Sequence, residues 1–183
     1  MTELVAKRLE LLRELVPRAT KVAVIVDPVL PQSETTLREL EAAASAMRLK
    51  LQILKASTSG EINAVFAALV RERPDALFVQ AGALFTTRRV QLVQLASRHA
   101  IPASYSGREY VEVGGLMSYG PKIVESFRHV GAYTGRILKG EKPSDLPVVQ
   151  PIKFEFVVNA QSAKLIGIDL PPTLLAIADE VIE

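Results

Sequence analysis

The sequence predicts an α/β fold built on a doubly wound parallel sheet, and three short apolar runs carry that prediction: Val22–Val26, Ala76–Val79 and Ile101–Ala103. Each run is short and apolar, as buried strands are, and the segments between them contain apolar residues three or four positions apart, as helices do. Strands joined by helical crossovers pair in parallel. The order β-α-β-α-β-α-β from Lys21 to Ala103 therefore indicates one parallel sheet with helices on its faces.

Each element expected in the first half of the chain has a local reason. Apolar residues recur at helical spacing over residues 3–16, and Pro17 ends that helix. Residues 21–26 are rich in β-branched side chains, as a central strand covered on both faces requires. Ser33 can cap the next helix, and Thr58-Ser-Gly-Glu61 matches the capping box that opens the one after it. The other strands expected here cover residues 49–54 and 76–79.

The second half of the chain is less regular. The short strand 101–103 completes the predicted sheet, and a polar loop follows over residues 104–114. Pro121 suits a first helical turn and Gly140 a C-terminal stop, so we expect a helix over 121–139. The remaining expected elements are a helix over 86–99, an extended segment over 116–119, a connector over 141–151, a strand over 153–158, a short helix over 160–166 and a last apolar turn over 174–177.

Composition excludes several classes of function. The 22 basic and 20 acidic residues give a formal net charge of +2 with the signs interspersed, so no clustered basic face for nucleic acid is expected. The absence of cysteine rules out disulfides, thiolate catalysis and cysteine-bound zinc. The two histidines, His99 and His129, lie far apart in the sequence, so we expect no histidine-based metal site.

The sequence contains no evident catalytic constellation. It has no Ser-His-acid order, no paired carboxylates in a shared apolar setting and no phosphate loop of the Walker kind, so we expect neither an enzyme nor a cofactor. No stretch approaches the roughly 20 apolar residues of a membrane span. The N-terminal residues carry charges where a signal peptide needs an apolar run, so we expect a soluble chain without an export signal.

Small or polar residues follow three of the predicted strands, and ligands of parallel sheets bind beyond the carboxyl ends of the strands. Asp27 follows the first strand and can pair with a ligand ammonium, or it can close an Asx turn on its own loop. After the third strand, Gln80, Ala81 and Gly82 let backbone N–H groups approach a ligand carboxylate, unless they form an ordinary strand-to-helix turn. Tyr105, after the fourth strand, can stack on a planar ligand or pack on the rim.

Further candidates lie between residues 109 and 119. Glu109 can contact a ligand or an opposite lobe of the protein, if the chain has one. The common alternative is that Glu109 is a solvent-exposed charge on a loop. Gly114 and Gly115 suit a hinge, because glycine tolerates unusual backbone angles. Ser118 and Tyr119 end the extended segment, near the expected cleft.

Several stretches, taken in order, resemble one known family. They are Arg8-Leu-Glu-Leu-Leu-Arg-Glu-Leu-Val-Pro17, Val22-Ala-Val-Ile-Val-Asp-Pro28, Arg71-Glu-Arg-Pro-Asp-Ala76, Gly114-Gly-Leu-Met-Ser-Tyr-Gly120, Ile137-Leu-Lys-Gly140, Pro143-Ser-Asp-Leu-Pro147, Asn159 and Ile168-Asp-Leu-Pro-Pro172. The chain resembles the substrate-binding proteins of bacterial ABC importers, in the branch of tryptophan/tyrosine transport. That family often has Asn-Pro where this chain has Asp27-Pro28.

The resemblance implies a type I periplasmic binding protein, whose two lobes close on a small molecule that is then delivered to an ABC permease. It implies an amino acid or similar ligand and an extracytoplasmic location. Residues 18–113 are expected to be one complete lobe. Residues 1–17 and 114–183 are expected to be crossing segments and parts of a second lobe that is mostly missing.

Two consequences and one alternative follow. The helices 3–16 and 121–139 and the strand 153–158 would expose apolar faces without the missing lobe, so we expect a homodimer that buries them. A chain that kept the lobe fold but lost transport would instead act as a stand-alone sensory or interaction module. An enzyme would have to rely on Asp27, Tyr105 and Glu109, the remaining reactive candidates.

Overall fold

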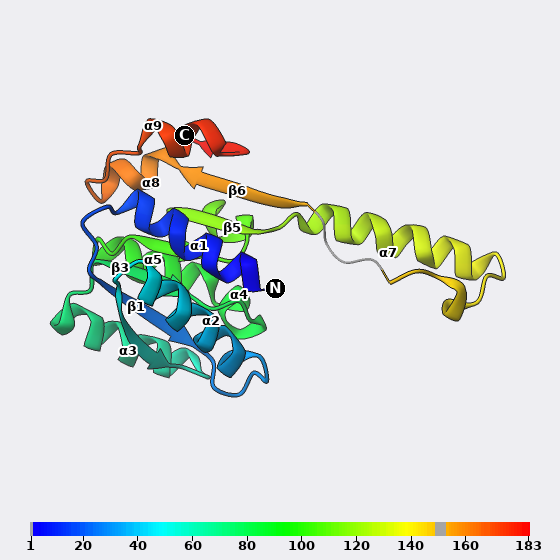
Figure 1. Cartoon of the computed structure of the whole chain (residues 1–183), viewed down its shortest axis with the longest axis horizontal. Coiled ribbons are helices and arrows are strands. Elements are labelled where there is room, and N and C mark those ends of the chain that lie inside the picture. The colour runs from blue at the N-terminus through cyan, green and yellow to red at the C-terminus, as the bar shows by residue number, and fades with distance from the viewer. Residues whose placement is uncertain (1, 149–152) are drawn as a thin grey trace.

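One seven-stranded sheet runs through the main body of the computed structural model, which describes residues 2–148 and 153–183 (Figure 1). The strand order is β2-β1-β3-β4-β5-β6-β7. Neighbouring strands from β2 to β5 are parallel, β6 is antiparallel to β5, and β7 is parallel to β6. The strands are β1 (Lys21–Val26), β2 (Lys50–Lys55), β3 (Ala76–Val79), β4 (Ala103–Tyr105), β5 (Met117–Pro121), β6 (Phe154–Asn159) and β7 (Glu180–Ile182). The predicted doubly wound parallel sheet is confirmed.

Helices cover both faces of the sheet and bury one apolar cluster on each. The helices α1 and α2 pack on one face together with residues of α8 and α9, and α3, α4, α5 and α6 pack on the other. Their bounds are α1 (Thr2–Leu15), α2 (Ser33–Ala46), α3 (Ser59–Glu72), α4 (Ala83–Thr87), α5 (Arg89–Arg98), α6 (Arg108–Val111), α7 (Ile123–Leu138), the 3₁₀ turn η1 (Pro143–Asp145), α8 (Ala160–Leu165) and α9 (Pro172–Ile177).

Strand β1 is apolar at almost every position because both of its faces are buried. Val22, Val24 and Val26 belong to the cluster beneath α1 and α2, whereas Ala23 and Ile25 belong to the cluster on the opposite face. Successive side chains of a strand point to opposite faces, so a central strand covered twice needs apolar residues at every position.

The first helix belongs to this body, which corrects the expectation that its apolar face lacks a partner. Leu9, Leu11, Leu12 and Leu15 of α1 are buried in the cluster beneath α1 and α2. Burying a leucine side chain stabilises the fold by about 1.5–3 kcal/mol, so α1 is anchored by several such contributions.

Strand β6 also has neighbours, in contrast to the expectation for residues 153–158. It pairs with β5 from Met117 to Pro121 and with β7 on its other side. The predicted division of the chain into residues 18–113 and flanking lobe segments stays a prediction. Residues on both sides of these boundaries share one sheet.

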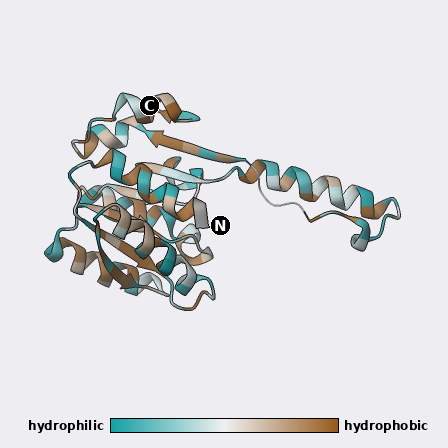
Figure 2. Ribbon diagram, in the orientation of Figure 1, coloured by the Kyte–Doolittle hydropathy of each residue, from teal (hydrophilic) through white to brown (hydrophobic). Residues whose placement is uncertain are grey.

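Helix α7 departs from the body. It leaves the end of β5 and projects away from the sheet (Figure 1). None of its residues is buried, and apolar positions alternate with polar ones along it (Figure 2). Its exposed apolar side chains include Ile123, Val124, Phe127, Val130, Ile137 and Leu138. Of the three elements expected to lack a partner, α7 is the one that this body leaves bare.

Three local differences from the sequence prediction stand out. The helix expected over 86–99 is two helices, α4 and α5, which meet at Arg88 with ψ near 19°. The polar loop expected over 104–114 contains the short helix α6. The last three-residue strand, β7, was not expected, and the predicted connector over 141–151 lies partly outside the described residues.

Candidate functional site

The carboxyl edge of the parallel strands gathers Asp27 and Gln80, as predicted. The Asp27 backbone N–H donates to Gln80 Oε1 at 2.9 Å, and both side chains are buried. Ser33 Oγ donates to the Asp27 carbonyl oxygen at 2.5 Å and lies 2.8 Å from Gln80 Nε2. These bonds tie the ends of β1 and β3 to the start of α2. We call Asp27, Ser33 and Gln80 the turn network.

The Asp27 carboxylate is engaged by its own turn, through Val29, and by the turn that follows β2, through Ser57. Its Oδ1 accepts from the Val29 backbone N–H at 3.1 Å and from Ser57 Oγ at 3.0 Å. The bond from Val29 is the Asx-turn geometry that the sequence offered as the alternative to ligand binding. A ligand contact of Asp27 stays a prediction.

Ala81 and Gly82 follow Gln80 at the surface. Ala81 is exposed, and Gly82 precedes the first turn of α4. A Cβ atom at Gly82 would lie 2.7 Å from Leu30 Cδ1, so glycine permits the close approach of these two turns. Their role as backbone donors to a ligand stays a prediction.

Arg8 of α1 reaches the same edge, and the sequence analysis did not select it. Its Nη2 donates to the carbonyl oxygen of Val79, the last residue of β3, at 2.5 Å. Its guanidinium carbon lies 3.7 Å from the centre of the Phe78 ring. Only 4% of Arg8 is exposed, and its Nε has no hydrogen-bond partner among the described residues. Burial lowers the pKa of Arg8 to about 9, so the group remains cationic at neutral pH.

A signal for Arg8 exists in the sequence. On a helical wheel it lies within the stripe formed by Val5, Leu12 and Leu15, at the spacing of one helical face. A charged residue in the middle of an apolar stripe is unusual, because isolated buried charge is costly. A charged residue in such a stripe therefore indicates a functional candidate, as polar residues after strands do.

Tyr105 is not at the rim, and this prediction of its position is wrong. The side chain is 1% exposed and stacks on Tyr110, with ring centres 4.7 Å apart. Tyr105 shares its face of β4 with Ala103, which packs toward α5, so its ring enters the core. Burial raises the pKa of Tyr105 far above its usual range.

Tyr110 of α6 brings a hydroxyl toward the edge that the sequence missed. Its oxygen lies 3.4 Å from Thr86 Oγ1, and burial raises the pKa of Tyr110 to about 12. The negative charge of Glu109 raises the pKa of this hydroxyl, and the positive charge of Arg8 lowers it. Glu109 itself is half-buried, and its contact with a ligand or a facing lobe stays a prediction.

The candidates on β5 divide between the two faces of the sheet. Ser118 is fully buried, pairs in register with Tyr105, and its Oγ has no partner among the described residues. Tyr119 is half-buried and stacks on Phe154, with ring centres 6.0 Å apart. Only Tyr119 is placed to meet solvent near the start of α7. The ligand contacts of both residues stay predictions.

Gly114 and Gly115 lie at the opposite, amino edge of β5. Their backbone N–H groups bond to the carbonyl oxygens of Val111 and Tyr110, which closes α6, and Gly114 has φ of 96°. A Cβ atom on Gly115 would lie 2.7 Å from the Tyr110 carbonyl oxygen. This turn accounts for both glycines, and their hinge role stays a prediction.

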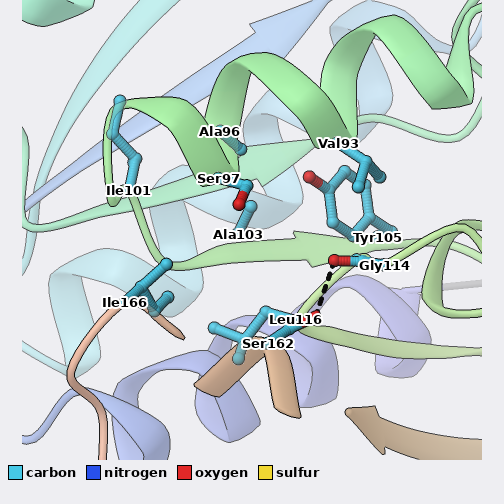
Figure 3. Close-up of a pocket in the computed structure, with 11 residues that line it drawn as sticks. Val93, Ala96, Ser97, Ile101, Ala103, Tyr105, Gly114, Leu116, Ser162 and Ile166 are labelled. Carbon is cyan, nitrogen blue, oxygen red and sulfur yellow. Dashed lines mark hydrogen bonds between the residues drawn. The ribbon is translucent and has the colours of Figure 1, made fainter. Parts of the chain in front are cut away.

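A small cavity beside these glycines is no ligand site. It lies at the amino ends of β4 and β5, and Ser162 Oγ donates to the Gly114 carbonyl oxygen at its side (Figure 3). Its volume is about 10 Å³, which is at the lower limit for one water molecule. The candidate site is instead the carboxyl edge, chosen for the polar groups of Arg8, Gln80 and Tyr110 that lie there.

The described residues provide neither a metal cluster nor a membrane-spanning helix. No group of three or more histidine or acidic side chains that could hold a metal ion occurs in this part of the chain. No helix over residues 2–148 and 153–183 is both long and apolar enough to cross a bilayer.

Known proteins resemble the chain over nearly its whole length. The model of a family described as ABC transporter substrate binding protein matches residues 2–182. A tyrosine-binding protein of Clostridioides difficile (strain R20291) is 26% identical over 158 residues, which make up 86% of this chain and 46% of that protein.

Two solved structures share the fold. An ABC domain from Streptococcus pneumonia in complex with L-Trp has a TM-score of 0.87 and 24% identity, covering 98% of this chain and 60% of that one. The ligand-free, open structure of a substrate-binding protein with adhesive properties from Clostridium difficile has a TM-score of 0.69 and 26% identity, covering 96% and 59%. The chain thus spans about half to three-fifths of the length of these relatives.

Proposed function

Because the chain belongs to the ABC transporter substrate-binding protein family, we propose that it binds an aromatic amino acid at the carboxyl edge of its parallel strands and releases it unchanged. In the cell it would serve as the solute-binding component of an importer, outside the cytoplasm, and deliver the ligand to an ABC permease.

The family match over residues 2–182, combined with the polar groups at one edge of the sheet, carries this proposal. Arg8, Tyr110 and Glu109 supply a cation, a hydroxyl and a carboxylate there, the groups that complement the two charges and the ring substituent of tyrosine. The tyrosine-binding relative supports the choice of an aromatic amino acid.

A thermal-shift screen followed by calorimetry tests the function. At about 100 times its dissociation constant, a ligand stabilises the fold by about 2.7 kcal/mol, which raises the melting midpoint by about 5–10 °C. We expect such a shift with L-tyrosine or L-tryptophan and none with L-lysine, and mass spectrometry should recover the ligand unaltered. Time-dependent conversion of the ligand would point to an enzyme instead.

The second candidate function is a stand-alone sensory or interaction module that kept the fold and lost transport. The exposed apolar face of α7 favours it, because such a face suits contact with another protein. The same screen separates the two functions, since a module of this kind would gain no stability from any amino acid.

We also propose that two copies associate through α7. One face of α7 carries a line of apolar residues spaced four, three and seven positions apart: Ile123, Phe127, Val130 and Ile137. This spacing is that of a coiled-coil seam, the apolar line along which two helices pack. Phe127 in it is 71% exposed. The apolar faces of α1 and β6 are covered within the body. Of the three surfaces predicted from the sequence to form the dimer contact, α7 is therefore the one that we retain.

Sedimentation velocity tests the dimer. The chain should sediment at twice its 19.9-kDa mass, and Phe127→Glu should reduce the mass to that of one chain because a charge would enter the seam. His129→Glu, on the opposite side of the same helix, should leave the dimer intact. A single-chain mass for the unaltered protein would contradict the dimer.

A further inference from the structure

Arg8 is a buried cation whose charge no side chain neutralises within the described residues. Its contacts are the Val79 carbonyl oxygen at 2.5 Å and the face of the Phe78 ring at 3.7 Å. A carbonyl oxygen and a ring face offset only part of the cost of removing a guanidinium from water. The fold therefore keeps a desolvated positive charge at the end of β3.

Some other arginines of the same chain, by contrast, pair with carboxylates. Arg108 contacts Glu112, Glu155 and Glu180 at 2.9–3.3 Å, although it is more exposed than Arg8. On α1 itself, Glu10 pairs with Lys7 and Glu14 accepts from Thr173, so neither carboxylate serves Arg8. Among the described residues Arg8 is the one buried basic side chain, and its hydrogen bond goes to a carbonyl oxygen and not to a carboxylate.

A second polar group without a partner lies on the same face of the sheet. Ser104 of β4 pairs in register with Phe78, the residue under the guanidinium. Ser104 is fully buried, and its Oγ has no hydrogen-bond partner among the described residues. Arg8 Nε and Ser104 Oγ thus leave two donors unused at the boundary between β3 and β4.

A carboxylate is the ligand group that suits these donors. Its two oxygens accept several hydrogen bonds, and the planar guanidinium presents parallel N–H groups that match them. Val79 is the last residue of β3, so the guanidinium lies at the edge where ligands of parallel sheets approach.

We propose that Arg8 is the anchor for the carboxylate of the ligand, with Ser104 as the second donor beneath it. The proposal rests on the proposed function, which supplies an amino acid as the ligand. The contact takes place when the Arg8 side chain turns from the Val79 carbonyl toward the incoming carboxylate, because 4% exposure admits no ligand otherwise.

Calorimetric titration of the whole chain with three related compounds tests Arg8. L-Tyrosine carries carboxylate and ammonium, L-tyrosinamide lacks the carboxylate, and 3-(4-hydroxyphenyl)propionate lacks the ammonium. The unaltered chain should bind tyrosine about 10- to 100-fold more tightly than tyrosinamide, the usual range for a charge-assisted hydrogen bond. In Arg8→Met this preference should vanish. Equal affinity of the unaltered chain for tyrosine and tyrosinamide overturns the proposal.

Urea unfolding of the same variants separates ligand binding from a structural role. Methionine keeps the packing on Phe78 without the charge, so Arg8→Met should unfold at an equal or higher urea concentration than the unaltered chain. A clearly lower midpoint would make Arg8 structural and count against the proposal. Arg8→Lys keeps the positive charge but loses the planar guanidinium with its paired N–H groups. This variant should retain a reduced preference for tyrosine over tyrosinamide, and an unchanged affinity for tyrosine would contradict the proposed role of Arg8.

The propionate distinguishes failure of the two proposals. If tyrosine and other amino acids do not bind but the propionate binds the unaltered chain and not Arg8→Met, the anchor holds and the proposed amino-acid function fails. If the unaltered chain binds none of these compounds, both proposals are wrong. If tyrosine binds equally to the unaltered chain and Arg8→Met, only the anchor fails.

Discussion

Two neighbouring regions at the carboxyl edge of the sheet differ in how completely their polar groups are paired. In the turn network, Gln80 and Ser33 use their side chains on each other and on the backbone of Asp27. One strand away, Arg8 and Ser104 each retain a buried polar atom with no partner in the described residues. Buried polar groups are almost always paired. The first region therefore has the features of a structural lock, a set of hydrogen bonds that holds elements together, and the second has the features of a ligand-binding site.

In these two regions the chemical type of a side chain does not decide its role. Asp27 and Gln80 have the residue types and positions of binding groups, yet their hydrogen bonds are used to hold β1, β3 and α2 together. Arg8 comes from a helix and its side chain is nearly enclosed, yet it is the group with unmatched charge. Unmatched charge at the carboxyl edge, more than residue type, supports the place proposed for the ligand.

Disruption of the turn network is expected to have the largest effect on stability. Gln80→Leu leaves the Asp27 N–H without its acceptor and Ser33 without its amide partner, so the free energy of unfolding should fall by about 3 kcal/mol. Urea unfolding measures the change. Gln94→Leu, at an exposed position of α5, is the matched control and should change stability by less than about 0.5 kcal/mol. Similar small changes in both variants would show that the network is not a structural lock.

A smaller effect concerns a fully paired carboxylate at the opposite edge. Asp75 accepts from the backbone N–H groups of Thr20 and Lys21 at 2.8 and 2.9 Å, and these bonds lower the pKa of Asp75 below its ordinary value of 3.8. A lowered folded-state pKa means that the unfolded chain takes up the proton first. The stability from Asp75 is therefore present above pH 3.8 and is lost as the pH falls through the lower folded-state value.

The variant Asp75→Asn tests this pH dependence. At pH 7 the free energy of unfolding should fall by about 1 kcal/mol, because the amide is a weaker acceptor for two N–H groups. Below pH 3.8 the difference from the unaltered chain should shrink, as followed by thermal unfolding between pH 3 and pH 7. A difference that stays constant over this range would show that the charge of Asp75 contributes nothing.

Much of the sheet could be predicted because its signals are local. The all-apolar β1 and the capping box of α3, in which Thr58 Oγ1 accepts from the Glu61 N–H at 3.2 Å, are found where the sequence places them. Elements of three or four residues, such as β7 and α6, offer too few positions for a period to emerge.

The site was predicted less well, for a geometric reason. The edge shared by Asp27 and Gln80 follows from parallel strands, but the direction of Tyr105 depends on which face of the three-residue strand β4 it occupies. The approach of Arg8 to Val79 joins residues 71 positions apart. Only the packing of α1 on the sheet creates that contact, and no local pattern encodes it.

A crystal structure of the chain grown with L-tyrosine tests the central claim most directly. We predict density for the ligand at the carboxyl edge, with a carboxylate oxygen about 2.8 Å from a guanidinium nitrogen of Arg8. A ligand bound elsewhere, with Arg8 still donating to the Val79 carbonyl oxygen, would contradict the claim.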